Sequence, residues 1–428
     1  MDRRNFALFC TAVLTFWLFA LAFGTATGFG VRGAGGPAAA APVLAPAVMA
    51  TAAPAQFVTA PQQAPAEPAG AAVSLPLSCR AAILVDQHTG TVLYEYNADR
   101  QLPIASITKV MTLLLTFEAV QAGTADFADL VPVSEHAYHM GGSQIWLEPG
   151  EQFTLDEMIR AICVSSANDA AVAVAEYIGG SEPVFVEQMN VRAARLGMKD
   201  TTFRNACGLD EAGHLSTARD VAVMSREILN RFPEIERYTT IWTDTLRGGE
   251  TQLLNTNKLL KRYRGITGLK TGTTGGAGVC ISASARRDGL SLIAVVLGAP
   301  SSAERFTDAI TLLDYGFANY RAAPLPDLSA APLELPVRGG TQPSVRLDYA
   351  ALPPTLLLPK EAGGALRAQV QLPQQLPAPV EAGAEVGLVT LYDGENSLGS
   401  YPVRAAEPVP HLEFAGAVQL LLRSLTGG

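Results

Sequence analysis

Two adjacent apolar runs constrain the fold of this chain more than any other stretch. Residues 279–285 and 290–297 consist largely of Val, Ile, Leu, Ala and Ser, and Arg287-Asp288-Gly289 between them is a strong hairpin signal. The second run carries apolar side chains at successive positions, so both faces of this strand need to be buried. The pair therefore predicts a sheet that is covered by helices on both sides.

The surrounding segments predict an α+β domain. Residues 79–86 and 91–96 are β-rich and flank a turn, which indicates a second hairpin at the start of the domain. Other segments have helical periodicity with capping residues at their ends. The predicted helices cover residues 106–123, 154–164, 170–177, 181–196, 217–230 and 302–320. Strands from both ends of a domain with helices between them are typical of an α+β architecture and not of a βαβ repeat.

The N-terminus has the features of a targeting segment. Arg3 and Arg4 precede an uncharged apolar run at residues 6–23, and small residues follow it. We expect residues 1–27 to be a signal peptide or an N-terminal anchor; the short run favours cleavage, and the chain leaves the cytoplasm in either case. Residues 28–77 are dominated by Ala, Pro and Gly and predict a disordered linker.

The C-terminal part predicts a second, smaller domain. Pro324-Leu325-Pro326 ends the first folded domain, which we place at residues 78–322. Short β-rich runs broken by Pro and Gly predict a small β-rich domain over residues 323–410. Residues 411–428 predict a short amphipathic helix that either packs on the protein or touches a membrane weakly, and its single cation, Arg423, favours packing.

Composition narrows the possible partners. The chain of 428 residues has a formal net charge of -9 and no basic run, so we expect no nucleic acid partner. The histidines lack the spacing of metal ligands, and we expect no metal and no cofactor. These are His88, His136, His139, His214 and His411. Beyond Cys10 in the targeting segment, we expect free thiols, although export would allow two to pair. They are Cys79, Cys163, Cys207 and Cys280.

Ser106-Ile107-Thr108-Lys109 is the stretch that suggests chemistry. Ser106 stands at the start of a predicted helix, where free backbone N–H groups and the positive end of the helix dipole stabilise a developing negative charge. Lys109 lies on the same helical face one turn later. A desolvated lysine near other cations can be neutral and take the proton of a serine. A bare Ser-x-x-Lys also arises by chance in a chain of this length, so the tetrapeptide alone is weak.

Two further elements strengthen the signal. Ser166-Ala167-Asn168 interrupts the apolar pattern between two predicted helices, where a hydroxyl and an amide can face a cleft. Lys270-Thr271-Gly272 precedes a predicted strand inside the glycine-rich run 265–278, whose backbone can approach a ligand closely. Taken one at a time, Ser106 and Asn168 could be helix caps and Lys270 a solvated loop cation. Their joint order favours a catalytic cleft.

In this order, the three elements match the Ser-x-x-Lys, Ser-x-Asn and Lys-Thr-Gly set of penicillin-recognising enzymes. The surroundings extend the match at residues 140–144, 147–150, 168–170 and 313–317. Over Ala81 to Tyr320 the chain resembles the low-molecular-mass penicillin-binding proteins, specifically serine-type D-alanyl-D-alanine carboxypeptidases of the DacF-like group, peptidase family S11. The resemblance implies a β-lactamase/transpeptidase-like domain, an antiparallel sheet with helices on both faces plus a helical subdomain, and a small all-β domain after it.

The resemblance also implies a role for each matched residue. Ser106 would attack the bond between two terminal D-alanines of a peptidoglycan stem peptide, Lys109 would be its base and Ser166 would relay protons. β-Lactams would inhibit by the same attack. The oxyanion hole would be the N–H groups of Ser106 and Thr273. The residues that would bind the substrate are Asn168, Lys270, Thr271, Gly272, Thr273 and, with its carboxylate, Arg305.

Three positions depart from the family pattern, and two other functions stay open. Thr273 stands where relatives often have an aromatic residue or His, Thr267 replaces a usual Asp, and Ala167 replaces Gly. A β-lactamase would share the three motifs but needs a deacylating glutamate, which the sequence does not identify. A wall-binding protein on an inactive scaffold is disfavoured because all the catalytic residue types are present.

Overall fold

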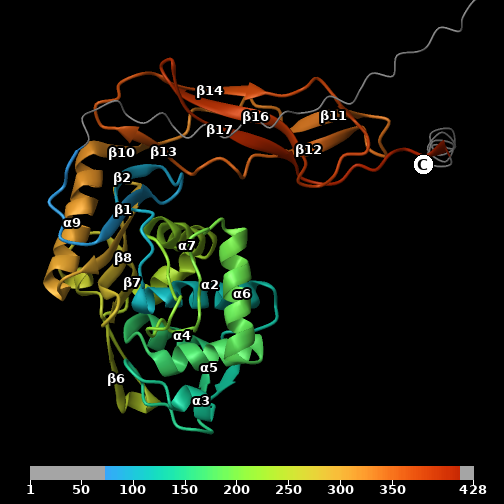
Figure 1. The fold of residues 1–428 in the computed structure, drawn as a ribbon. Helices are drawn as coiled ribbons and strands as arrows, with labels where there is room; N and C mark the ends of the chain where they lie inside the picture. Colours follow the sequence, from blue (N-terminus) through green and yellow to red (C-terminus); the bar gives the residue numbers. More distant parts are fainter. Residues whose placement is uncertain (1–72, 415–428) are drawn as a thin grey trace, which may run out of the picture. The chain divides into compact units, whose positions relative to one another are not determined.

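The computed structural model describes residues 73–414 (Figure 1). The predicted targeting segment, nearly all of the predicted linker and residues 415–428 of the predicted C-terminal helix lie outside the described residues. None of the helices within residues 73–414 combines the length and the apolar character that a membrane span needs.

A five-stranded antiparallel sheet forms the centre of the first domain, and it confirms both predicted hairpins. A strand near the start of the domain pairs with a strand near its end in the register Ile83↔Val295, so both ends of the domain contribute to one sheet. The spatial order is β2 (Val92–Tyr96), β1 (Ala81–Asp86), β9 (Leu290–Ala299), β8 (Gly278–Arg287) and β7 (Ile266–Thr274).

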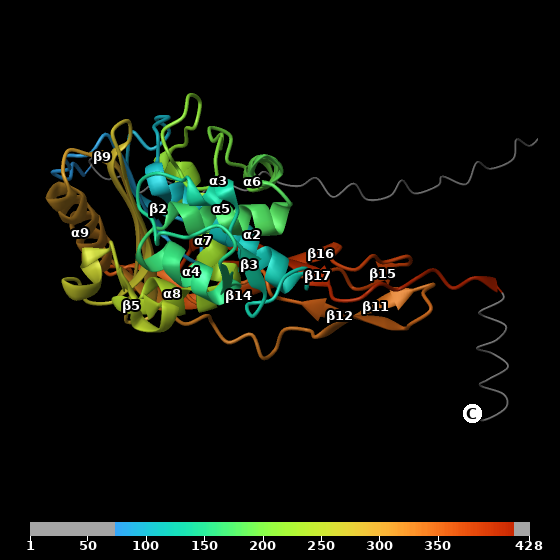
Figure 2. The same ribbon diagram turned by 90° about the horizontal axis from the view of Figure 1, so that it is seen from below.

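Strand β9 is buried on both faces, as its sequence predicts. Ile293 and Val295 contribute to one hydrophobic cluster, while Leu292 and Ala294 contribute to the other. Helix α9 (Ser302–Asn319) covers the second face, and the larger set of helices lies on the first (Figures 1 and 2). The α+β class and the β-lactamase/transpeptidase-like architecture are therefore confirmed.

The helices of this domain begin close to their predicted positions. Thr154 forms a capping box with Glu157, and Thr217 accepts from the N–H of Asp220, so side chains set two of the starts. The main helices are α2 (Lys109–Gln121), α4 (Leu155–Val164), α5 (Asn168–Gly179), α6 (Glu182–Arg195) and α7 (Ala218–Arg231). Shorter elements complete this part: η1 (Ala105–Thr108), β3 (Leu130–Pro132), α3 (Glu135–Tyr138), β4 (Gln152–Thr154), η2 (Pro233–Ile235), α8 (Glu236–Thr239), β5 (Thr243–Leu246), η3 (Arg247–Gly249), β6 (Thr251–Leu254) and η4 (Lys258–Lys261).

Two local expectations need correction. Helix α5 starts at Asn168 and not at Ala170, so the break after α4 is only three residues long and Ser166 turns the chain with a φ of 60°. Lys270-Thr271-Gly272 precedes β8 as expected, but it is not part of a loop: it lies inside β7, paired with β8 in the register Lys270↔Ser282. Strand pairing thus overrides the loop preference of the surrounding glycines.

The C-terminal residues form an all-β domain with its own core. Its two longest strands, β16 (Glu385–Asp393) and β17 (Asn396–Ala405), form a hairpin. The other strands are β10 (Tyr320–Ala323), β11 (Glu334–Arg338), β12 (Ser344–Asp348), β13 (Leu356–Pro359), β14 (Leu366–Gln371) and β15 (Leu376–Pro377). Val345, Val389 and Val403 are fully buried at its centre.

The four cysteines within the described residues are buried free thiols. Burial raises the pKa of Cys79 and of Cys163 to about 12. Both side chains are therefore neutral at physiological pH.

Candidate active site

Ser106 occupies the first turn of the helical segment that η1 and α2 form together. Ile104 and Ile107 on either side of it are fully buried, whereas Ser106 is half-buried. The packing of the two isoleucines therefore fixes the turn and leaves Ser106 partly exposed. The N–H of Ser106 lies in a helical first turn, where no preceding carbonyl of the helix can accept it.

Lys109 is fully buried and contacts the serine directly. Its Nζ lies 2.8 Å from Ser106 Oγ, and it donates to Asn168 Oδ1 at 2.6 Å and to the carbonyl of Cys207 at 2.7 Å. Burial lowers the pKa of Lys109 to about 8, and the nearby Cys207 and Asp169 oppose this shift. Burial is thus the largest cause of the weakened basicity of Lys109.

These three contacts orient the neutral amine. A neutral lysine has two N–H bonds and one lone pair, while the carbonyl of Cys207 and the Oδ1 of Asn168 can only accept. The amide orientation of Asn168 is set by its Nδ2, which donates to the carbonyl of Gly141 at 2.6 Å. Both N–H bonds of Lys109 are therefore used, and its lone pair faces the hydroxyl of Ser106.

The second motif connects the cleft to the loop of residues 141–147. The N–H of Asn168 donates to the carbonyl of Ser143 at 2.7 Å. Asp169, also buried, accepts from the N–H groups of Ile145 and Leu147 at 3.0 and 3.2 Å, and burial raises its pKa. The start of α5 therefore holds both Lys109 and this loop. Ala167 at its N-cap has a φ of -57°, so glycine is not needed there.

The third motif joins the second through a pair of side chains. Lys270 is 2% exposed, and its Nζ donates to Ser166 Oγ at 2.7 Å. Burial and the charges of Lys109 and Arg305 hold the pKa of Lys270 well below its usual range. The hydroxyls of Thr271 and Thr256 are 2.6 Å apart. Thus Lys109 and Lys270 each contact one serine, and their repulsion disfavours protonation of both.

Gly272 lets β7 approach the turn that carries Ser106. A Cβ atom at this position would lie 2.8 Å from the carbonyl oxygen of Ile104 and 3.0 Å from the nitrogen of Ser106. Two positions before Lys270 in the strand, Gly268 is similarly confined, while Thr267 donates to Ser284 Oγ at 2.8 Å. A pair of hydroxyls, of Thr267 and Ser284, thus supports β7 at this position.

We expect Gly272→Ala to lower the rate of penicillin acylation about 100-fold, because the methyl group displaces the turn that carries Ser106. Gly275→Ala is the matched control, since its Cβ would come no closer than 4.0 Å to Asp210. Acylation rates and thermal unfolding of both variants give the measurement. An unchanged rate in Gly272→Ala would show that the close approach does not matter.

Arg305 is a buried cation without a carboxylate partner among the described residues. It projects from α9, is 5% exposed, and its Nη1 donates to the carbonyls of Gly272 and Cys280 at 3.3 and 3.2 Å. Its Nε has no hydrogen-bond partner, and burial lowers its pKa to about 10. A buried cation with an unused donor favours an anionic ligand beside Gly272.

The structure also brings in residues that the sequence analysis did not identify. The segment from Arg204 to His214 contributes the carbonyl of Cys207, and His214 contacts Thr108 at 2.8 Å. Gly208, with a φ of 87°, is the sequence signal that could have identified this segment, because a glycine between apolar residues often marks a close backbone approach.

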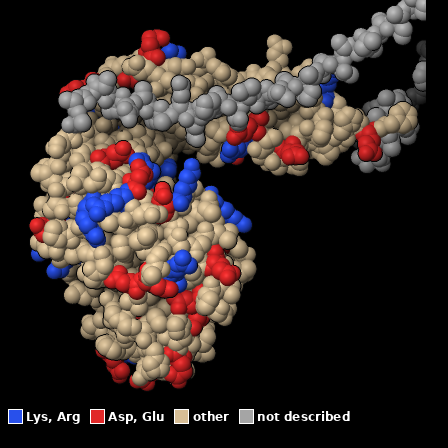
Figure 3. Space-filling model, in the orientation of Figure 1, with Lys and Arg blue, Asp and Glu red and all other residues tan. Residues whose placement is uncertain are grey.

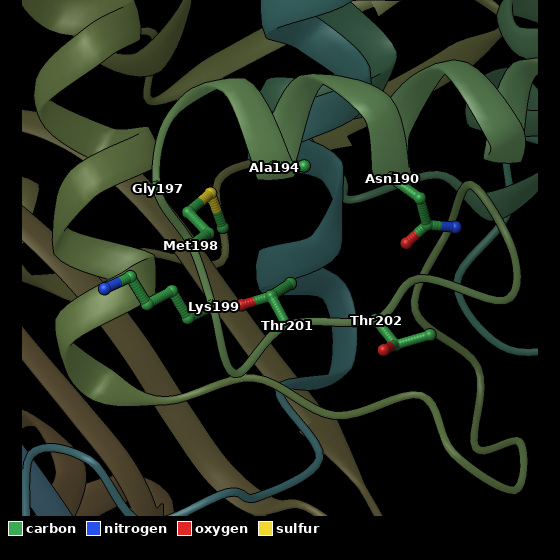
Figure 4. A pocket seen from close by; sticks show the side chains of 7 residues that line it. All are labelled: Asn190, Ala194, Gly197, Met198, Lys199, Thr201 and Thr202. Carbon is green, nitrogen blue, oxygen red and sulfur yellow. The ribbon is translucent and has the colours of Figure 1, made fainter.

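Two cavities in the described part of the chain lie away from the three motifs. A cavity of about 520 Å³ lies beside the end of α6 (Figure 4), lined by Asn190, Ala194, Gly197, Met198, Lys199, Thr201 and Thr202. A smaller one of about 280 Å³ includes Pro103, Asp210 and Gly276, next to the end of β7. Basic and acidic side chains are mixed on the face shown in Figure 3.

The sequence matches two family models. The D-alanyl-D-alanine carboxypeptidase model of peptidase family S11 matches residues 66–301, which include all three motifs. The model of the penicillin-binding protein 5 C-terminal domain matches residues 331–411. The second match covers the all-β domain.

Individual relatives and solved structures agree. The chain is 39% identical over 350 residues to D-alanyl-D-alanine carboxypeptidase DacF of Bacillus subtilis (81% of this chain, 89% of that protein) and 33% identical over 370 residues to DacC of Escherichia coli (85% and 91%). Penicillin-binding protein 5 of Haemophilus influenzae superposes with a TM-score of 0.66 at 29% identity, over 79% of this chain and all of that one. Penicillin-binding protein D2 of Listeria monocytogenes in its cefotaxime-bound form has a TM-score of 0.53 at 34% identity, over 57% and 99%.

Proposed function

Because this chain belongs to the peptidase S11 family of D-alanyl-D-alanine carboxypeptidases, we propose that it removes the terminal D-alanine of peptidoglycan stem peptides through an acyl-enzyme on Ser106. It is a serine carboxypeptidase and a penicillin-binding protein. The observation that supports Ser106 as the nucleophile is its contact with the fully buried Lys109.

Acylation begins with a proton transfer from Ser106 to Lys109. The neutral amine takes the proton while Oγ attacks the carbonyl carbon between the two D-alanines. The negative charge that develops on the carbonyl oxygen is stabilised by the N–H groups of Ser106 and Thr273. One such preorganised donor contributes about 3 to 4 kcal/mol to transition-state stabilisation.

Breakdown of the tetrahedral intermediate requires a proton on the leaving nitrogen. Ser166 lies within hydrogen-bonding distance of Lys270 and supplies its hydroxyl proton to the amine, while Lys270 replaces it. This transfer also relieves the repulsion between Lys270 and the newly protonated Lys109. The C–N bond breaks, D-alanine leaves, and water then hydrolyses the ester. Asn168 binds the substrate amide while it holds Lys109.

The substrate carboxylate provides a negative charge beside Arg305 and Lys270. Arg305 and Lys270 are buried cations, and Thr271 lies in the same strand as Lys270. A bound carboxylate offsets the cost of burying both cations and favours the protonated form of Lys270 that the leaving-group step needs. Gly272 and Thr273 form the adjoining backbone.

Arg305→Gln is expected to erase the preference for a free C-terminal carboxylate. Charge-assisted hydrogen bonds contribute up to about 3 kcal/mol, so the wild type should prefer a peptide acid over its carboxamide by about 100-fold in kcat/KM. The variant should lose most of this ratio, and Arg321→Gln, on the exposed side of β10, should keep it. An undiminished ratio in Arg305→Gln would assign carboxylate binding to other residues.

β-Lactams inhibit by the same acylation, and neither alternative function is favoured. The family relatives are carboxypeptidases, and the solved structures include β-lactam-bound penicillin-binding proteins, so a β-lactamase is the weaker assignment. A catalytically silent wall-binding protein would not need a fully buried lysine within hydrogen-bonding distance of the half-buried Ser106.

The enzyme acts outside the cytoplasm, as its family does. We place it more specifically as a secreted protein or one attached to the outer face of the cytoplasmic membrane, where it trims peptidoglycan during cell-wall biogenesis. The support is the basic and apolar N-terminal sequence at residues 3–23. The C-terminal helix is at most an additional weak membrane contact.

The test combines two substrates. The purified full-length protein is incubated with diacetyl-Lys-D-Ala-D-Ala and, separately, with a fluorescent penicillin. We expect release of D-alanine and one covalent label per chain, with slow hydrolysis of the penicilloyl ester. Absence of both would contradict the proposed function, and rapid turnover of nitrocefin without D-alanine release would favour a β-lactamase.

A further inference from the structure

The segment from Arg204 to His214 contacts the catalytic helix without belonging to any of the three motifs. It contributes the carbonyl of Cys207, which is 2.7 Å from Lys109 Nζ. Gly208 follows with a φ of 87°, and a Cβ there would lie 2.0 Å from the carbonyl oxygen of Ala105. The backbone of this segment is therefore pressed directly against η1, where only glycine fits.

His214 fastens one end of the segment to the catalytic helix. Its Nδ1 accepts from the N–H of Arg204 at 3.2 Å, so its Nε2 carries the proton and donates to Thr108 Oγ1 at 2.8 Å. The ring is 3% exposed, and burial lowers its pKa to about 4. The charged groups that face it are Asp210, Glu211 and Arg204. Thr108 is the residue immediately before Lys109.

Asn205 holds the turn that carries the Cys207 carbonyl. Its Oδ1 accepts from the N–H of Gly208 at 2.7 Å, and its Nδ2 donates to the carbonyl of Leu209 at 3.1 Å. These two bonds close a turn around Cys207 and leave its carbonyl pointing away from the turn, toward Lys109. Asn205 thus shapes the turn that carries the Cys207 carbonyl, and His214 ties the same segment to Thr108, the neighbour of Lys109.

We propose that His214 and Asn205 are positioning residues of the carboxypeptidase reaction: they hold the Cys207 carbonyl against Lys109, so that the lone pair of the neutral amine faces Ser106. This inference rests on the proposed role of Lys109 as the base. If the carbonyl shifts, one N–H of Lys109 can turn toward Ser106, and the amine then donates to the serine when it should accept from it.

The experiment separates binding from acylation in stopped-flow reactions with a fluorescent penicillin. For His214→Leu we expect the limiting acylation constant per active site to fall about 10- to 100-fold, with the dissociation constant of the initial complex unchanged. His214→Gln should recover most of the rate, because its amide can both accept from Arg204 and donate to Thr108. His88→Leu, in the half-buried turn after β1, is the matched control.

A second variant keeps the test valid if His214→Leu does not fold. Thr108→Val removes the partner of His214 with nearly the same shape, and Thr108→Ser keeps it, so the first should slow acylation and the second should not. Active-site titration corrects each rate for the folded fraction. Wild-type acylation constants in both His214→Leu and Thr108→Val would overturn the inference. A wild type that takes no penicillin label would instead contradict the proposed function itself.

Discussion

Ser106→Ala is expected to abolish both D-alanine release and covalent labelling by penicillin. Without Oγ the enzyme has no group to form the acyl ester, and loss of a serine nucleophile reduces turnover by on the order of 10⁴- to 10⁶-fold. The fold should be unaffected, because Ser106 is half-buried and the isoleucines beside it hold the turn. The measurement is D-alanine release by the variant, together with its labelling by a fluorescent penicillin.

Ser181→Ala is the matched control for this change, since Ser181 precedes α6 without making a side-chain capping bond. It should keep full activity. A label that survives in Ser106→Ala would assign the nucleophile to another hydroxyl, and peptide mapping of the labelled chain would identify it. Ser166 would then be the first candidate, because its hydroxyl contacts Lys270.

Lys109→Arg should reduce acylation by about 10³-fold, within the range that general-base catalysis supplies. Arginine keeps the positive charge but stays protonated, so it cannot take the proton of Ser106. Lys109→Met should be equally impaired, which would show that the charge alone is not what matters. Lys199→Arg, on an exposed position, serves as the control. Retention of near wild-type acylation in Lys109→Arg would exclude Lys109 as the base.

The pH dependence of the wild type tests the same role. The pKa of Lys109 is lowered to about 8, and only its neutral form can act as a base. The acylation rate of the free enzyme should therefore rise with pH, by about tenfold per unit below that pKa, and level off above it. In Lys109→Met this rise should disappear. A wild-type rate that is flat from about pH 6 to 9 would contradict a neutral Lys109.

The sequence was sufficient to predict the layers of the catalytic domain, because the signals were strong and local. The unbroken apolar character of β9 required helices on both faces. Thr154 and Thr217, as helix-capping residues, predicted where α4 and α7 begin. The Lys-Thr-Gly stretch was harder. Its glycines favour a loop, and only pairing with β8, far from any local preference, makes it a strand.

For the site, the motifs predicted the side chains but not the backbone groups that orient them. The motifs predicted Ser106, Lys109, Ser166 and Lys270, and in the structure each of these serines contacts one of these lysines. The carbonyl of Cys207 could not be predicted, because a carbonyl leaves no mark in residue types. The burial that lowers the pKa of Lys109 is likewise a property of the packed fold, which residue types alone do not show.

The four buried cysteines have a consequence for how this protein can mature. Outside the cytoplasm an unfolded chain meets oxidants that would cross-link or oxidise its sulfur atoms. Once folded, the thiols are enclosed and neutral, so they resist both reactions. Folding therefore protects the thiols chemically, and the rate at which a thiol reagent consumes the cysteines reports how often the native structure opens.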